Sequence, residues 1–175
     1  MRLYFNLSYV RIIPREVLSL CMRKLTKEKA AYIAGFLDGD GSIHVRLKPN
    51  DTYRYGFQVA PNIVFYQSQK EQEFLERLRQ TVGGGYVRRR NDGIAEYVIG
   101  DVGTMRDLIS SVLPYLILKK RQAKLLVKIF EIKEKVKNKK DFLQLAKLID
   151  EYQNLNYSKK RTVNSSQVAQ SFKQR

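Results

Sequence analysis

Two segments in the first half of the chain alternate hydrophobic and polar side chains with a period of two, which is typical of half-buried β-strands. In residues 42–48, the three residues Ile43, Val45 and Leu47 share one face, and the opposite face is basic. Residues 53–67 alternate in the same way, with an inward face made of Phe57, Val59, Ile63 and Phe65. Pro61 has no N–H to donate to a neighbouring strand, so we expect a sheet edge or a bulge at that point.

A second pair of strands, residues 86–90 and 94–99, is predicted around the turn Asn91-Asp92-Gly93, because such turns favour hairpins. Hydrophobic side chains at helical spacing predict five helices, over residues 27–39, 70–82, 102–113, 119–137 and 141–155. The order is helix, two strands, helix, two strands and then helices. It predicts an α+β domain, in which helices pack on one face of an antiparallel four-stranded sheet.

Charge indicates the class of partner. The 175 residues include 33 Lys and Arg but 17 Asp and Glu, so the net charge is +16. Such an excess points to a polyanion, with nucleic acid as the first candidate and an anionic membrane surface as the second. A membrane-surface protein would carry its basic residues on an amphipathic helix. Here they line predicted strands, which favours nucleic acid.

Cysteine and histidine are too scarce for several kinds of site. Cys21 and His44 are the only residues of their types. They exclude an internal disulfide and a zinc cluster built from Cys and His. Any hydrolytic chemistry must therefore rest on carboxylates and a metal bound through oxygen.

The outward face of the predicted sheet is rich in basic and amide side chains. Arg and Lys can bond guanine edges in the major groove, and Asn and Gln can bond adenine edges. An ordinary solvated face usually mixes Lys with Glu, but Glu96 is the one clear acid here. We therefore predict DNA contact by His44, Arg46, Lys48, Asn50, Tyr53, Gln58, Asn62, Tyr66, Arg88 and Arg90. For His44, contact with a base, contact with a phosphate and simple exposure all remain open.

The stretch from Tyr32 to Gly41, YIAGFLDGDG, combines an unusual helix with two carboxylates. Gly35 and Gly39 are four residues apart and share one helix face, which suits the close approach of a second backbone. Asp40 falls at the helix C-terminus, where the dipole disfavours a negative charge and a divalent cation would reverse that penalty. Asp38 points to another side of the helix. The plainer alternative is a buried glycine-containing helix that ends in an ordinary turn.

This stretch resembles the motif of the LAGLIDADG homing endonucleases, and the resemblance extends from about residue 25 to residue 155. It is greatest to the branch with one motif per chain, encoded in organellar group I introns. The resemblance implies the αββαββα fold of that family and a homodimer, in which Gly35 and Gly39 lie at the interface between two crossing helices. Each helix would then deliver one metal-binding carboxylate to double-stranded DNA.

The resemblance also implies roles for individual residues. Asp40 would bind the divalent metal, most readily Mg²⁺ with Mn²⁺ as an alternative, helped by the backbone carbonyl of Gly39. Gln67 would orient water, and Lys119 would stabilise the charge that develops on the phosphate. Arg121 would either assist Lys119 or bind the DNA backbone. Glu71 stands where some relatives carry a basic residue, which is a departure from the family pattern.

The resulting hypothesis is a site-specific homing endonuclease that makes a double-strand cut in a long, near-palindromic target and so promotes intron mobility. No small-molecule cofactor and no membrane are expected. The alternative is a non-cleaving relative, either an RNA-binding intron maturase or a DNA-binding regulator. Only the nuclease requires the carboxylate of Asp40.

The two ends of the chain have different compositions from the middle. Residues 1–24 mix apolar and basic side chains, lack the features of a secretory signal and only weakly resemble a transit peptide. Met22 is an alternative start, and we expect a poorly ordered extension. Residues 25–155 are expected to form the endonuclease domain, and residues 156–175 a loosely structured basic tail. The family resemblance implies location in a chloroplast or mitochondrion.

Overall fold

The computed structural model describes residues 25–155 and 163–174, so the predicted N-terminal extension lies outside the described residues. The elements are α2 (Lys27–Asp40), β1 (Gly41–Pro49), β2 (Phe57–Ser68), the 3-10 helix η1 (Gln69–Glu71), α3 (Gln72–Val82), β3 (Tyr86–Arg89), β4 (Ile94–Ile99), α4 (Val102–Val112), α5 (Lys120–Lys135), α6 (Lys139–Gln153) and α7 (Ser165–Gln174). None of the helices described is long and apolar enough to cross a membrane.

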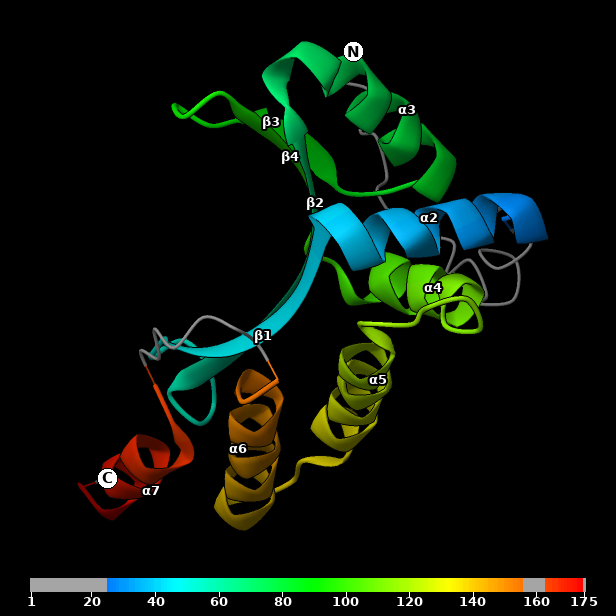
Figure 1. Ribbon diagram of the computed structural model, residues 1–175. Coiled ribbons are helices and arrows are strands. Elements are labelled where there is room, and N and C mark those ends of the chain that lie inside the picture. Colours follow the sequence, from blue (N-terminus) through cyan, green and yellow to red (C-terminus); the bar gives the residue numbers. More distant parts are fainter. Residues whose placement is uncertain (1–24, 156–162, 175) are drawn as a thin grey trace, which may run out of the picture.

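The four strands form one antiparallel sheet in the order β1-β2-β4-β3, so the predicted α+β architecture is confirmed. The long strand β2 pairs with β1 over residues 57–65 and with β4 over residues 63–68, so only its middle has a neighbour on both sides (Figure 1). Pro61 lies opposite Val45, in the part of β2 that pairs with β1 alone. The sheet edge expected at this proline is therefore present.

Helices α2, α4, α5 and α6 cover one face of the sheet, as Figure 1 shows. The alternation of the first strand explains this layering, because its three inward side chains are all buried. Ile43 and Leu47 belong to the same core as Leu37 of α2 and Leu126 of α5. Burial of such a side chain contributes about 1.5–3 kcal/mol. The opposite face of the sheet carries no helix of this set and keeps its polar side chains.

The junction between α2 and β1 is unusually tight. Thr26 begins the helix by accepting a hydrogen bond from the N–H of Lys29, and the helix continues to Asp40 before β1 starts at Gly41. A Cβ placed on Gly41 would lie 2.6 Å from Leu37 Cδ1 and 2.7 Å from the Leu37 carbonyl oxygen. Only glycine fits there, and the sharp passage from helix to strand fixes Asp40 at the end of the helix.

The C-terminal region differs from our expectation. We predicted a loosely structured tail over residues 156–175, but residues 165–174 form helix α7. Asn164 and Gln167 cap this helix reciprocally, since each side-chain oxygen accepts the backbone N–H of the other residue. Val168 is fully buried, and the Phe172 ring lies 6.1 Å from that of Phe142. Two hydrophobic side chains four residues apart thus anchor a polar segment, and composition alone concealed them.

Candidate active site and nucleic-acid interface

Asp40 is the last residue of α2, and its side chain is exposed. In the part of the chain that the structure describes, no hydrogen bond reaches its carboxylate. The C-terminal end of a helix is electronegative, so a carboxylate there is stabilised only by a positive partner. Asp40 therefore has the position and the freedom that a cation ligand requires.

Asp38, two residues earlier, has a different environment. Its carboxylate accepts hydrogen bonds from three consecutive backbone N–H groups, those of Ile117 at 2.7 Å, Leu118 at 3.1 Å and Lys119 at 2.9 Å. These groups come just before α5, so Asp38 anchors the start of that helix to the end of α2. The sequence placed Asp38 away from Asp40 but did not indicate this role, because its partners lie about eighty residues further along the chain.

Lys119 lies beside the end of α2. Its Nζ donates a hydrogen bond of 2.6 Å to the backbone carbonyl oxygen of Asp38. Burial lowers the pKa of Lys119, and the negative charges of Asp38 and Asp40 work against that effect. The structure thus brings the predicted cation to the predicted carboxylate, although the two residues are far apart in sequence.

Gln67 lies near the end of β2. Gly41 pairs with Phe65, so Gln67 lies just beyond the start of β1, at the same end of the sheet as Asp40. Its Oε1 accepts the N–H of Ser68 at 2.9 Å, which leaves the Nε2 amide group available. Glu71, the departure from the family pattern, is exposed at the end of η1.

The donors near Asp40 fit a divalent ion bound through oxygen, since they are one carboxylate and the carbonyl groups of the last helical turn. Among the described residues, no group of three or more His, Cys, Asp or Glu side chains is placed to hold a metal ion. The described part of the chain therefore supplies only some of the ligands that a metal at this position would take.

Most of the residues predicted to contact DNA lie on the outward face of the sheet. Opposite pairs across β1 and β2 include His44 with Asn62 and Lys48 with Gln58. Tyr66 continues the row on β2, opposite Glu96 of β4. Desolvation by burial raises the pKa of the Tyr66 phenol, and the neighbouring Glu96 adds to that effect. Polar side chains thus extend from β1 across to the β3–β4 hairpin, interrupted on β2 by Ala60 and Val64.

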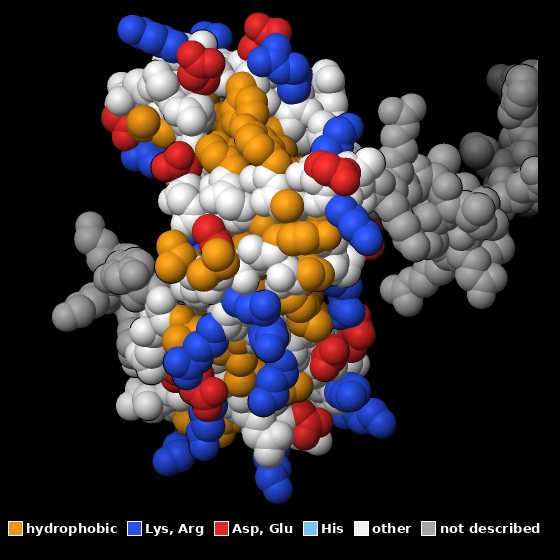
Figure 2. Space-filling model, turned by 45° about the vertical axis from the view of Figure 1, so that its right-hand side comes forward, with side chains coloured by type: hydrophobic (Ala, Val, Ile, Leu, Met, Phe, Trp, Pro, Cys, Tyr) orange, Lys and Arg blue, Asp and Glu red, His pale blue; other side chains and the backbone are white. Residues whose placement is uncertain are grey.

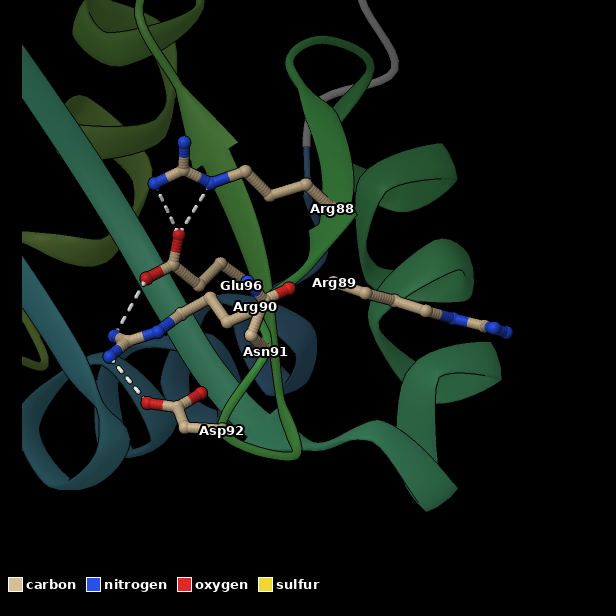
Figure 3. Close-up of a pocket in the computed structure, with 6 residues that line it drawn as sticks. All are labelled: Arg88, Arg89, Arg90, Asn91, Asp92 and Glu96. Carbon is tan, nitrogen blue, oxygen red and sulfur yellow. Dashed lines mark hydrogen bonds and ion pairs between the residues drawn. The ribbon is translucent and has the colours of Figure 1, made fainter.

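Glu96 has a role that we did not predict. The sequence suggested a lone acid on a basic face, but its side chain is buried and binds two arginines (Figure 3). Arg88 donates to one carboxylate oxygen at 2.5 and 2.6 Å, and Arg90 donates to the other at 3.1 Å. Arg90 also pairs with Asp92 at 2.5 Å. Glu96 thereby holds both guanidinium groups on the outward face, where they can meet a base edge or a phosphate.

The remaining candidates lie away from this row. Asn50 sits in the turn after β1, where its Oδ1 accepts the backbone N–H of Thr52 at 3.1 Å. We expected the second strand to begin at Tyr53, but residues 53–56 belong to the turn and β2 begins at Phe57. In these residues, hydrogen bonds within the turn, including that from the Gly56 N–H to the Tyr53 carbonyl, take the place of strand pairing. Arg121 is exposed on the first turn of α5.

Gly35 and Gly39 are exposed on the outer face of α2. A Cβ placed on either residue would have no neighbour within 4 Å in the described part of the chain. Contacts among the described residues therefore do not require glycine at these positions. Large hydrophobic side chains are exposed on α2 itself, where Tyr32 is 60% exposed, and in the segment before α5, where Ile117 is 83% and Leu118 73% exposed. Figure 2 shows hydrophobic side chains along the middle of the face in view, with many Lys and Arg side chains in its lower half.

Comparison with known proteins agrees with this geometry. The family model for LAGLIDADG endonucleases matches residues 33–126, from inside α2 to inside α5. The chain belongs to the LAGLIDADG endonuclease family. Our expectation from the Tyr32–Gly41 motif is therefore confirmed.

Two relatives cover most of the chain. The DNA endonuclease I-CreI of Chlamydomonas reinhardtii is 35% identical over 146 residues, which is 83% of this chain and 89% of that protein. The DNA endonuclease I-CvuI of Chlorella vulgaris is 32% identical over 145 residues, 83% of this chain and 90% of that protein.

Solved structures of relatives share the fold. The crystal structure of I-CvuI in complex with its target, in the presence of calcium, superimposes with a TM-score of 0.80 at 31% identity, over 85% of this chain and 94% of that one. The archaeal endonuclease I-Vdi141I complexed with DNA gives a TM-score of 0.74 at 21% identity, over 84% of this chain and 96% of that one, and supports the fold alone.

Proposed function

We propose that two copies of this LAGLIDADG endonuclease bind one long, near-palindromic DNA target and cut both of its strands by metal-dependent hydrolysis. The observation that carries the proposal is the exposed carboxylate of Asp40, held at a fixed helix end beside Lys119. The related I-CvuI is a DNA endonuclease whose structures include a complex with its target. The polar face of the sheet supports DNA as the substrate.

We assign a separate role in the cleavage reaction to each residue of the site. Asp40 holds a divalent cation, with a backbone carbonyl from Gly39 as a second oxygen donor. The cation, when bound, lowers the pKa of the attacking water and stabilises the leaving oxygen. Lys119 Nζ stabilises the charge that develops on the scissile phosphate, and the free amide of Gln67 orients water. A structure of I-CvuI with DNA was determined in the presence of magnesium, and we propose Mg²⁺ here, with Mn²⁺ as a substitute.

A homodimer would supply a second Asp40 for the second DNA strand. One Asp40 cannot serve both strands of a duplex that is cut symmetrically. The glycine face of α2 leaves room for a second α2 at close range, and exposed Ile117 and Leu118 provide apolar surface nearby. An isologous two-fold contact would place two Asp40 carboxylates side by side and extend two sheets along the DNA.

A non-cleaving protein on the same scaffold, such as an RNA-binding maturase or a DNA-binding regulator, would keep the basic face but would have no use for an exposed Asp40. We therefore favour the nuclease. We further propose that the cut promotes mobility of a group I intron and that the protein acts in a chloroplast or mitochondrion.

Selection of cleaved sites from a randomised DNA library, in the presence of Mg²⁺, tests the activity and the target together. We expect recovered fragments to share one long sequence with approximate two-fold symmetry, and we expect no fragments when the metal is chelated. A protein that binds a defined RNA or DNA sequence but never cuts it would support the non-cleaving alternative. A selected site with no symmetry would contradict the homodimer.

A further inference from the structure

His44 and Asn62 form a hydrogen-bonded couple in the middle of the outward sheet face. They lie directly opposite each other on β1 and β2, and Asn62 Nδ2 is 3.3 Å from His44 Nε2. The neighbours of Asn62 on the same face of β2 are Ala60 and Val64, which are small and buried. The couple is therefore a separate, neutral polar site on a face that is otherwise largely cationic.

The hydrogen bond constrains the imidazole ring. An amide N–H can donate to Nε2 only when that nitrogen carries no proton, so this arrangement of the two groups goes with the tautomer whose proton lies on Nδ1. Desolvation lowers the pKa of His44, and the charges of Arg46 and Lys48 lower it further, whereas Glu96 on β4 raises it. The environment therefore favours the neutral ring.

The hydrogen bond also constrains the amide. Asn62 Oδ1 lies away from His44, on the side of Gly100, where a Cβ would be 3.4 Å from the oxygen. The N–H that points away from Oδ1 is the one directed at His44. Oδ1 and the second N–H then lie side by side on the remaining edge of the amide. The reversed amide would place Oδ1 against Nε2 and would go with the other tautomer, whose proton lies on Nε2 and is donated to Oδ1.

We propose that Asn62 reads an adenine in each half of the DNA target and that His44 is the positioning residue that holds the Asn62 amide in the orientation this contact needs. Adenine presents an N6 donor beside the N7 acceptor in the major groove, and these two groups match an acceptor beside a donor on an Asn amide. The inference rests on the proposed function, because it requires the sheet face to lie in the major groove.

The test is selection of bound DNA from a library randomised across the target, carried out with the full chain and scored base by base. Binding, not cleavage, is the readout. We expect the wild type to prefer adenine at one position of each half-site. Asn62→Ala should reduce that preference by about 5- to 150-fold, as expected for loss of one bidentate contact. Asn62→Asp, which can only accept, should favour cytosine at the same position.

Substitutions at His44 test whether its ring orients the Asn62 amide or only packs against it. His44→Phe keeps a ring but removes the acceptor, so the amide can turn and the adenine preference should weaken at the Asn62 position alone. His44→Gln keeps an acceptor and should retain more of that preference than His44→Phe. Gln58→Ala, on the same strand and opposite Lys48, is the matched control and should alter a different position.

The outcomes distinguish this inference from the function on which it rests. A wild type that selects no DNA sequence would overturn the proposed function itself. If the wild type selects a target and Asn62→Ala leaves every position unchanged, only the reading role of Asn62 is wrong. Equal effects of His44→Phe and His44→Gln, or an effect of His44→Phe at another position, would overturn the positioning role.

Discussion

At the scale of single residues, two aspartates only two positions apart have opposite surroundings. Asp40 is exposed at the end of α2, whereas Asp38 is half-buried and accepts three backbone N–H groups. Helix geometry turns the two side chains to different sides, and within the described residues only the Asp38 carboxylate accepts hydrogen bonds. We therefore assign cation binding to Asp40 and a structural role to Asp38.

Replacing Asp40 with Asn should abolish cleavage while leaving the fold and DNA binding nearly intact. The substitution removes the negative charge that holds the cation, and no hydrogen bond within the described residues depends on it. Cleavage of the selected target, DNA affinity and thermal unfolding should be measured in parallel. A variant that cuts at close to the wild-type rate would contradict the assigned role.

Replacing Asp38 with Asn should instead reduce stability. One carboxylate oxygen becomes an NH₂ group that faces backbone N–H donors, so at least one of these N–H groups loses its acceptor. We expect a loss of about 1–3 kcal/mol in the free energy of unfolding. Denaturant unfolding of both variants provides the comparison, with Asp40→Asn as the matched control. Equal stability of the two variants would show that the three hydrogen bonds contribute little.

His44 should titrate below the usual histidine value of 6.5, because burial and two nearby cations disfavour its charged form. The unfolded chain then binds more protons in mildly acidic solution, so this group's contribution to stability is present above pH 6.5 and is lost as the pH falls below it. The chain has one histidine, so its NMR signal needs no assignment. Asn62→Asp should move the midpoint upward. A wild-type midpoint at or above 6.5 would contradict the expectation.

At the scale of elements, α2 contains two glycines that no contact within the described residues requires. Glycine weakens a helix interior by about 1 kcal/mol relative to alanine. Gly35 and Gly39 nevertheless sit on an exposed face where a Cβ would meet nothing within 4 Å among the described residues. We propose that they serve a close contact with a second α2.

Gly35→Leu should therefore stabilise the isolated chain slightly and yet prevent close pairing of two α2 helices. We expect the unfolding temperature to be equal to or higher than that of the wild type, and double-strand cleavage to be lost. Light scattering with and without DNA should report dimers for the wild type and monomers for the variant. Gln144→Leu, which adds the same side chain to an exposed position of α6, is the control. A Gly35→Leu protein that dimerises and cuts normally would refute the proposed interface.

At the scale of the whole molecule, the net charge of +16 and the long polar face of the sheet act together. Each lysine or arginine that neutralises a phosphate releases a condensed counterion, which makes affinity depend steeply on salt. Glu96 does not present its negative charge on this surface, because its side chain is buried beneath the two guanidinium groups that it binds.

DNA affinity should accordingly fall by about 10³- to 10⁵-fold between about 50 and 200 mM salt if six to ten phosphates are contacted. Fluorescence anisotropy with the selected target, over a series of salt concentrations, measures the slope. Arg46→Gln should weaken binding and, if that side chain contacts a phosphate, reduce the slope by about one. A flat response to salt would point to a partner other than nucleic acid.

The sequence by itself determined the strands, the helices up to α6, the two faces of the sheet and the position of Asp40 at a helix end. Each of these follows from a pattern that is local: alternation along a strand, spacing along a helix, or a turn such as Asn91-Asp92-Gly93. Local patterns also located Gly35 and Gly39 on one face, since helical spacing alone decides that.

Only the tertiary structure decided which side chains meet. Asp38 binds the backbone before α5, Lys119 lies beside Asp40, and Glu96 holds two arginines on its neighbouring strand and turn. Helix α7 likewise depends on the packing of Val168 in the core. The physical reason is that a hydrogen bond or a packed contact depends on distance in space, and residues distant in sequence are brought within that distance only when the whole core has formed.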